Sequence, residues 1–446
     1  VEGRTLAGLD INPAVSELAS PMFVGKQAHE NDGGYYYWTH FDYYGLFCDM
    51  AARNRPYGGI FAKHPPIYTD HGTYIHYDRQ RVKDMADGAQ YFVDNLRYSK
   101  GESTRHTGPS VMFRYFYQAG YDWLGSEMMY APDDILMCSL RGASRAYSKP
   151  IFGSLHAMQW PYDYSDIERS PLRLFMSHAV AYMHGSSHLN TEDALYQTEK
   201  DADRFSEQGR KHLEVQNLMM DYVQTHDRRG ELHTGIAILQ GRNDPWNFFG
   251  MSSIWHQDGE KWECGDMISS YQLFGLYYPW EISPGAGQGG WNEFSYSPYG
   301  AVDFVPVEAP RDVLGKYKLA VFLGWNTYSR ADFERLRDFV FDGGTLIMTA
   351  AHANSCLQPD MDPVFSEDDS PLREMLGDDY RDLTGKNVIP FGAGKTIFYA
   401  QKEYPSAESI REDYLAEMKA QSDLAVASEP ELGWIDAMEG VDFAIW

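Results

Sequence analysis

The sequence of 446 residues contains little cysteine, less positive than negative charge and no long apolar run. Its four cysteines form no CxxC pair and no Cys/His ligand spacing: Cys48, Cys138, Cys264 and Cys356. Free, buried thiols are therefore expected, rather than a disulfide framework or a zinc site. No apolar stretch reaches the roughly 18 residues that a membrane-spanning helix needs, so a membrane span is not expected.

The charge balance excludes one class of partner. Lys and Arg number 38 against 64 Asp and Glu, which gives a formal net charge of −26. This field repels phosphates, so neither duplex nucleic acid nor an anionic membrane surface is an expected partner. High solubility is the simplest consequence of the charge.

Aromatic residues are abundant, with 32 Tyr and 11 Trp in the chain. Most aromatic rings serve as core material, but flat rings also stack on the C–H faces of sugars. The sequence starts at Val1 without Met or a signal-like segment, which is typical of a mature or trimmed form and leaves the compartment open.

The length predicts two or three domains. Strand-like and helical patterns alternate in residues 1–228, which predicts a parallel sheet and a TIM-like (β/α) barrel. About five strands can be counted there, fewer than the eight of a closed barrel. The barrel is therefore expected to be incomplete at its N-terminus, or to hold further strands in its aromatic-rich loops. Residues 426–446 end on a strand-like run (VDFAIW) and are expected to begin a C-terminal β domain.

Residues 229–425 predict a doubly wound α/β domain. The near-continuous apolar run Lys318–Leu323 is followed by an amphipathic helix, Arg330–Phe341, and by a second strand, Thr345–Thr349. A class I amidotransferase would need a nucleophilic Cys after such a strand. Here the strand is followed by GWNTYS, so a structural or oligomer-forming role is expected instead. Further elements are predicted at Thr234–Leu239, Thr396–Ala400 (strands) and Ser406–Ala420 (helix).

Polar side chains follow three predicted strands between Tyr121 and Tyr196. Ligands gather at the carboxyl ends of parallel strands, so these positions are candidates for a site. The strands are Asp122–Gly125, Ile151–Leu155 and Ser186–Leu189, and the helices between them run from Pro132 to Tyr147 and from Ser165 or Asp166 to Met183. Upstream, helices are predicted at Arg79–Leu96, capped by Asp78, and at Ser110–Ala119, closed by Gly120.

Two glutamates are the predicted catalytic residues. Glu127 and Glu192 each come just after a strand and a small polar residue, and glycoside hydrolysis needs two carboxyl groups around one anomeric carbon. The alternative is that both are solvated loop glutamates or helix-start acids. Asp193 is a rival to Glu192, Asp122 is a rival to Glu127, and Glu30 is a third candidate.

Substrate contacts are predicted at strand ends and in aromatic-rich loops. His156 and Trp160 would lie between the two glutamates, although a buried, hydrogen-bonded histidine is the alternative for His156. The histidine-rich loop after residue 63 has no helical i, i+4 ligand pair, so no metal site and no cofactor are predicted. The full set of predicted substrate contacts is Lys26, His29, Glu30, Trp38, His64, Asp70, His156, Trp160, Asn190 and Asp193.

Three segments resemble glycoside hydrolase family 42 and related clan A glycosidases. Residues 317–352 (YKLAVFLGWNTYSRADFERLRDFVFDGGTLIMTAAH) are similar to the family's strand–helix–GGTL segment, and DWLGSE (122–127) and LNTED (189–193) resemble its acid/base and nucleophile strand ends. Ser126 stands where that clan usually has Asn, and the spacing between the two glutamates is short for strands four and seven.

The resemblance implies a barrel followed by an amidotransferase-like domain, and a homo-oligomer (dimer or trimer) formed through that domain. It also implies a retaining, β-galactosidase-like hydrolase acting on carbohydrate, with Glu127 as acid/base and Glu192 as nucleophile. A non-catalytic carbohydrate-binding or assembly protein and a glycoside phosphorylase are the alternatives.

Overall fold

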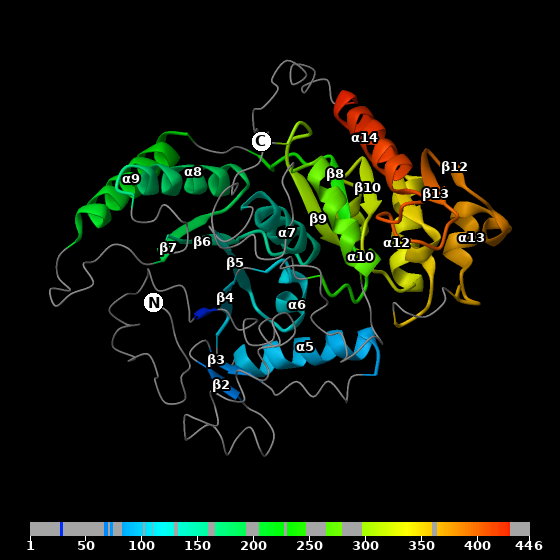
Figure 1. Cartoon of the computed structure of the whole chain (residues 1–446), viewed down its shortest axis with the longest axis horizontal. Coiled ribbons are helices and arrows are strands. Elements are labelled where there is room, and N and C mark those ends of the chain that lie inside the picture. The colour runs from blue at the N-terminus through cyan, green and yellow to red at the C-terminus, as the bar shows by residue number, and fades with distance from the viewer. Residues whose placement is uncertain are drawn as a thin grey trace.

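The computed structural model describes thirteen segments of the chain: residues 27–29, 67–69, 72–74, 83–100, 103–108, 110–128, 133–158, 166–192, 205–226, 230–246, 265–278, 297–358 and 364–428. Two larger sheets lie side by side with α7 between them (Figure 1). The strand-like VDFAIW run at residues 441–446 lies outside the described residues. The fold is α/β, because each of the two sheets is built mainly from parallel strands that alternate with helices.

The first sheet has five parallel strands in the order β1-β4-β5-β6-β7. Their bounds are β1 Gln27–His29, β4 Arg105–Gly108, β5 Trp123–Met128, β6 Gly153–Ala157 and β7 His188–Glu192. A small antiparallel pair, β2 Ile67–Thr69 and β3 Gly72–Tyr74, stands apart from it. The described strands form an open sheet, and no closure into a barrel is traced among them.

Helices cover one face of this sheet: α5 Met85–Lys100, α6 Phe113–Gln118, α7 Asp133–Ala146, α8 Arg169–Met183 and α9 Glu207–Thr225. On that face His106 stacks on Phe116 of α6, and Thr191 accepts a hydrogen bond from Gln216 of α9. Side chains alternate between the two faces of a strand, so every second residue points away from the helices.

Several predicted boundaries needed correction. The helix predicted from Arg79 begins at Met85, and the side chain of Asp84 rather than Asp78 caps it by accepting from the backbone N–H of Asp87. The helix predicted from Ser165 or Asp166 begins at Arg169, and the Asp166 carboxylate accepts from the backbone N–H of Arg169. Gly120 does close α6, with a φ of 93° that suits glycine.

The strands after Tyr121 reach further than predicted. β5 contains Glu127, β6 contains His156, and β7 contains Asn190 and Glu192. The polar residues predicted to follow the strands therefore continue the ladder itself. This matters for the site, because strand alternation then decides which way each side chain points.

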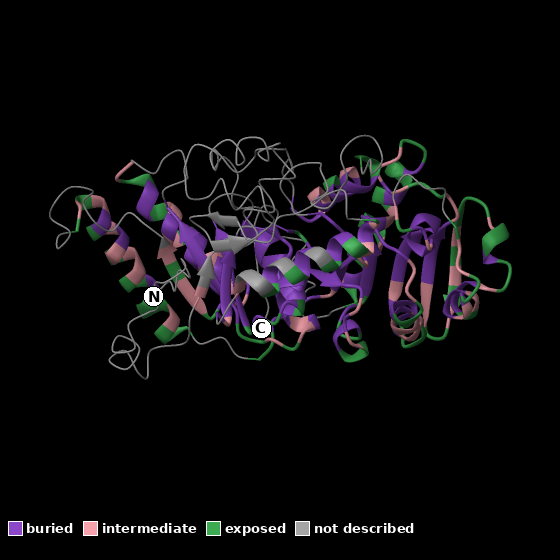
Figure 2. Ribbon diagram, turned by 90° about the horizontal axis from the view of Figure 1, so that it is seen from below, coloured by how far each residue is buried: buried purple, intermediate pink, exposed green. Residues whose placement is uncertain are grey.

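The second sheet has six strands in the order β12-β13-β11-β10-β8-β9. They are β8 Ile236–Gln240, β9 Val302–Pro306, β10 Leu319–Phe322, β11 Thr345–Thr349, β12 Lys386–Phe391 and β13 Gly394–Tyr399. All pairs are parallel except the β12–β13 hairpin. The order reverses at β8, as in a doubly wound sheet. Its central strands are buried on both faces (Figure 2).

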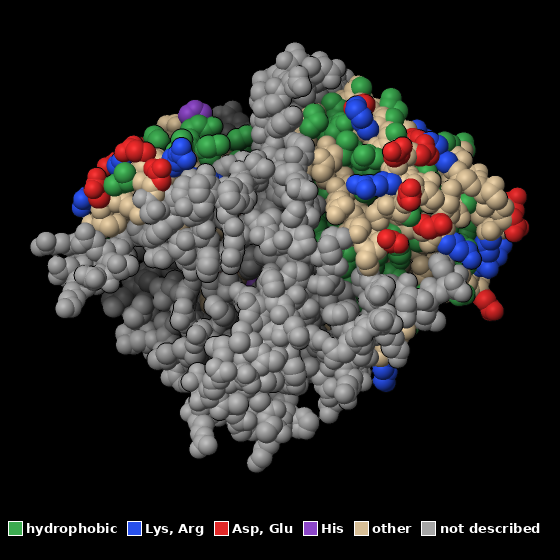
Figure 3. All heavy atoms as spheres, viewed as in Figure 1, with side chains coloured by type: hydrophobic (Ala, Val, Ile, Leu, Met, Phe, Trp, Pro, Cys, Tyr) green, Lys and Arg blue, Asp and Glu red, His purple; other side chains and the backbone are tan. Residues whose placement is uncertain are grey.

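The remaining helices belong to this second half of the chain. They are α10 Gly265–Ser269, α11 Arg311–Leu314, α12 Arg330–Phe341, α13 Ser370–Leu376 and α14 Arg411–Ala427, with short 3₁₀ turns at Ser270–Leu276, Ala350–Ala353 and Tyr380–Asp382. Acidic and basic side chains are interspersed on the surface of this half (Figure 3). None of the helices in the described ranges is long and apolar enough to cross a bilayer.

Candidate functional site

The face of the first sheet that points away from the helices is polar. We call it the polar face; the register places on it Gln27, Arg105, Thr107, Trp123, Glu127, Leu155, His188 and Asn190. The contacts agree with this alternation, because Gln27 Nε2 donates to Thr107 Oγ1 at 3.0 Å and Trp123 lies 5.6 Å from His188 between ring centroids. Five of its members belong to the stretch where the sequence predicts the site: Trp123, Glu127, Leu155, His188 and Asn190.

Trp123 spreads over the middle of the polar face because two neighbouring strands carry glycine there. A Cβ on Gly125 would lie 2.8 Å from the indole, and a Cβ on Gly153 would overlap it. The missing side chains leave the room that the indole fills. The guanidinium carbon of Arg105 lies 3.8 Å from the centre of the Trp123 ring, so the cation stacks on the indole.

Glu127 is fully buried on β5, two residues beyond Gly125. Its register partner on β6 is Leu155, and the partner of Leu155 on β7 is Asn190, which is exposed. Two strand spacings separate Glu127 from Asn190, or about 10 Å between their Cα atoms. The structure thus brings Glu127 and Asn190 to one face and one row.

Glu192 is the last residue of β7 and pairs with Ala157. Its position is two residues beyond Asn190 and therefore has the same parity along the strand. The β6 residues between the two glutamates on that parity are Leu155 and Ala157, not His156.

His156 points the other way, into the layer between the sheet and the helices. Its Nε2 lies 2.8 Å from Ser154 Oγ and its Nδ1 lies 2.7 Å from Ser177 Oγ of α8; Ser177 in turn donates to Asp133 of α7 at 2.6 Å. Burial, and then the neighbouring His178, hold the pKa of His156 well below its ordinary value. The structure therefore gives His156 the alternative role of a buried, hydrogen-bonded histidine, away from Glu127.

Most other predicted contacts cannot be placed. Lys26, Glu30, Trp38, His64, Asp70, Trp160 and Asp193 lie outside the described residues, and His29 is described only as the last residue of β1. Asp122, the rival to Glu127, precedes β5, is exposed and pairs with Lys149 at 2.9 Å. Within the described ranges no group of three or more potential metal ligands is found.

The sequence did not single out two prominent members of the polar face, Arg105 and Trp123. Arg105 starts a strand of only four residues, RHTG, which carries no clear period-2 pattern. Trp123 lies in the segment DWLGSE, whose predicted catalytic residue is the glutamate. The available signal was the pair of glycines at strand centres, since glycine in a strand often marks a close approach.

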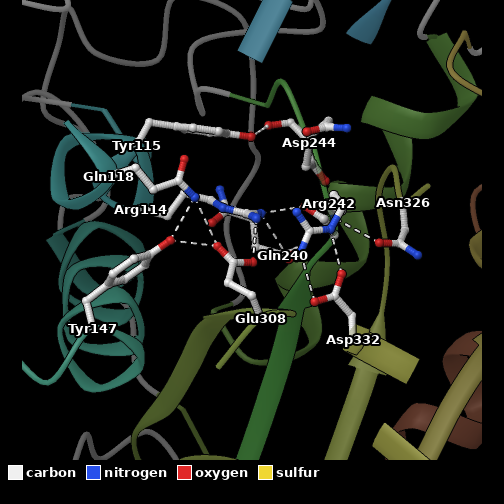
Figure 4. Close-up of polar contacts among 12 residues, drawn as sticks. Arg114, Tyr115, Gln118, Tyr147, Gln240, Arg242, Asp244, Glu308, Asn326 and Asp332 are labelled. Atoms are coloured by element: carbon white, nitrogen blue, oxygen red, sulfur yellow. Dashed lines mark hydrogen bonds and ion pairs between the residues drawn. The ribbon is translucent and has the colours of Figure 1, made fainter. Parts of the chain in front are cut away.

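Arg114 of α6 links the first half of the chain to the second sheet (Figure 4). It donates to the carbonyl oxygen of Gly241 at 2.5 Å and to Glu308 at 2.5 Å. Within the second half, Arg242 donates two hydrogen bonds to Asp332. Burial raises the pKa of Asp244 to about 7, and Tyr271 donates to its carboxyl oxygen.

The carboxyl edge of this second sheet is closed by packing at its reversal point. A Cβ on Gly324, directly after β10, would overlap the ring of Tyr271, and one on Gly241, after β8, would overlap the Trp325 carbonyl. Ligands commonly bind at this place in doubly wound sheets. Here the ring of Tyr271 and the backbone of Trp325 pack directly against these two glycines.

Comparison with known proteins gives a match in three dimensions only. No protein-family model and no curated protein sequence matches the chain. Among solved structures, Gan42B, a GH42 beta-galactosidase from G. stearothermophilus, is 12% identical with a TM-score of 0.44 over 88% of this chain and 65% of its own.

Two further beta-galactosidases show the same level of similarity. The enzyme from Bacillus circulans sp. alkalophilus is 10% identical, with a TM-score of 0.46 over 87% of this chain and 66% of its own. The enzyme from the Antarctic haloarchaeon Halorubrum lacusprofundi is 13% identical, with a TM-score of 0.40 over 79% of this chain and 52% of its own. The chain thus spans about half to two thirds of the length of these structures, and it is similar to GH42 beta-galactosidases in its overall course.

Proposed function

We propose that the protein is a glycoside hydrolase that cleaves glycosidic bonds of oligo- or polysaccharides on the polar face of its first sheet. The observation that supports this most is a fully buried glutamate, Glu127, in a row with Asn190 and close to the indole of Trp123. A carboxyl group, an amide and a flat aromatic ring are the groups that sugar cleavage and sugar binding use.

Glu127 is the proposed acid/base and Glu192 the proposed nucleophile. In the first step Glu127 protonates the leaving oxygen while Glu192 attacks the anomeric carbon, so the glycosidic C–O bond breaks and a glycosyl ester forms. In the second step Glu127 takes a proton from water, whose oxygen attacks the same carbon and releases Glu192. The anomeric configuration is retained by the two inversions.

The strand spacing is compatible with this pair. Glu127 and Glu192 are two strands apart and offset by one residue pair, so their Cα atoms are separated by about 12 Å in a flat sheet. A retaining pair requires about 5 Å, and an inverting pair requires about 6.5–9.5 Å.

The test is turnover of nitrophenyl glycosides and plant or algal oligosaccharides by matched variants. Glu127→Gln and Glu192→Gln are each expected to lower kcat by at least about 10³-fold while the fold survives. Asp122→Asn, at an exposed residue that pairs with Lys149, is the matched control and should keep near-normal turnover. Normal turnover in either glutamine variant would remove that residue from the proposal, and Glu30→Gln would then be examined.

The stereochemical outcome tests the finer assignment. Proton NMR of the first product formed should show the anomer of the substrate if the mechanism is retaining. The other anomer would establish an inverting reaction, in which Glu192 activates water instead. A β-galactosidase-like specificity predicts that nitrophenyl β-galactoside is the best small substrate of the panel.

A further inference from the structure

Arg105 is a buried cation that the described part of the chain leaves without a counter-charge. Its side chain and backbone together are only 9% exposed. Its guanidinium stacks on Trp123, and no hydrogen bond or ion pair links it to another residue in the described part of the chain. Burial lowers the pKa of Arg105, and no carboxylate in the described segments offsets that effect.

The other two buried guanidinium groups among the described residues, those of Arg114 and Arg141, have several acceptors each. Arg114 donates to two carbonyl oxygens and to Glu308, and Arg141 donates to Asp303 at 2.5 Å and to the carbonyl oxygen of Val302 at 2.7 Å. A buried charge is costly unless it is paired and hydrogen-bonded, and both of these follow that rule. Arg105 departs from it, although its five N–H donors are fixed in a fork that suits an anion.

A second donor stands next to this cation. Trp123 is only 4% exposed, and its Nε1–H reaches no acceptor in the described part of the structure. A buried indole N–H is normally hydrogen-bonded. Two adjacent side chains, both more than nine-tenths buried, therefore offer donors without acceptors.

Both donors lie on the face that carries the proposed catalytic row. Arg105 and Trp123 are register partners at the starts of β4 and β5, four residues before Glu127, or about 13 Å along the strand. The Trp123 ring extends from there over Gly125 and Gly153, so its far edge lies two residues, about 7 Å, from the row of Glu127.

We propose that Arg105 and Trp123 bind an anionic oxygen group of the glycan, a uronic acid carboxylate or a sulfate ester, so that acidic glycans are the substrates. This inference rests on the proposed glycosidase function. The guanidinium fork matches both groups, which present two or three oxygens in one plane or on one face. The indole adds an N–H donor and a flat surface for the ring that carries the charge.

The net charge of the protein disfavours anionic ligands. At −26, the protein repels anions at long range, so a preference for an acidic glycan must come from a local group. Removal of one buried guanidinium should then remove the preference.

Binding can be measured without turnover by isothermal titration of the full chain carrying Glu127→Gln. The probes are two matched pairs: an oligogalacturonate with its carboxyl-reduced counterpart, and a sulfated galactan oligosaccharide with its desulfated counterpart. At least one acidic member is expected to bind roughly 10- to 100-fold more tightly than its neutral partner. Adding Arg105→Gln should abolish that difference, Trp123→Phe should reduce it by a few fold, and Arg169→Gln, on the exposed face of α8, should leave it unchanged.

The remaining outcomes are distinct. Equal binding of acidic and neutral members, no binding of either acidic member, or a preference that survives Arg105→Gln overturns the inference. Inorganic sulfate or phosphate that binds as tightly as the acidic oligosaccharide would assign the donors to a free anion and also overturn it. A charge preference in a protein that hydrolyses no glycan would instead overturn the proposed catalysis while this binding site stands.

Discussion

Arg141 of α7 donates through Nε to Asp303 of β9 at 2.5 Å, and both side chains are fully buried where the two halves of the chain meet. Arg145 and Tyr317 also donate to Asp303. Burial alone would raise the pKa of Asp303, but Arg141 and then Arg145 outweigh it, so the pKa is lowered. The two halves are therefore joined by a charge cluster that depends on each member.

Removal of one member of this cluster should be strongly destabilising. Asp303→Asn leaves two guanidinium groups buried without their carboxylate, and a loss of about 3–5 kcal/mol in the free energy of unfolding is expected. Denaturant unfolding measures it. Arg311→Gln, which removes an exposed pair with Asp342, is the control and should cost less than about 1 kcal/mol. Equal losses in the two variants would contradict the importance of burial.

Replacing Gly142 by alanine is expected to change stability in the direction opposite to that usual for a glycine inside a helix. Glycine to alanine inside a helix normally stabilises by about 1 kcal/mol. In α7, however, a Cβ at residue 142 would overlap the carbonyl oxygen of Phe304 on β9. Gly142→Ala is therefore expected to destabilise by about 1–3 kcal/mol through overpacking. The control is Gly265→Ala at the start of α10, where a Cβ meets open space and no loss is expected.

The buried histidines behind the first sheet predict an acid-sensitive fold. Burial, followed by the charge of His212, lowers the pKa of His178 to about 4, and burial lowers that of His212 to about 4, from 6.5. The unfolded chain then binds more protons between about pH 6.5 and pH 4, so stability is full above that window and falls as the pH drops through it.

The melting temperature should show this decline, and His178→Phe should flatten it. His226→Gln at the exposed end of α9 should keep the slope of the parent protein. An unchanged slope in His178→Phe would show that this histidine is not the titrating group. The ring of His178 on α8 lies 4.3 Å from that of His156 on β6, so the loss should reach the strand that carries Leu155.

Gly153 tests the placement of Trp123 without touching a polar group. Gly153→Ala puts a methyl group where the indole lies, so the ring must move away from the glycine strand. A displacement of this size near a catalytic row should lower kcat/KM by about 10- to 100-fold. Tryptophan fluorescence should shift in the same variant. Gly265→Ala again serves as the control, and full activity with a shifted ring would separate Trp123 from catalysis.

Local patterns predicted much of the fold. The apolar run Leu319–Phe322, the helix Arg330–Phe341 and the strand Thr345–Thr349 match the structure almost residue for residue, because buried parallel strands are continuous apolar runs and the helix has a clear 3.6-residue period. Gly120 was likewise predictable, since few other residues accept a positive φ at a helix end.

The polar residues at the strand ends were harder to interpret. The sequence pattern places Glu127, His156 and Asn190 in one α/β stretch, but it predicts strands that end before these three residues. Because these residues lie within the strands, the alternation along each strand decides which face a side chain points to. His156 points to the helices, whereas Leu155, one residue earlier, and its register partner Glu127 point to the polar face.

What the sequence by itself determined is the alternation of strands and helices, the net negative charge and the presence of carboxyl, amide and aromatic groups in one segment. Only the tertiary structure decided which of them share a face, and that Arg105 stacks on Trp123 above two glycines. The reason is physical: secondary structure follows from periodicity within a few residues, whereas this stack requires register between strands that are separated by helices.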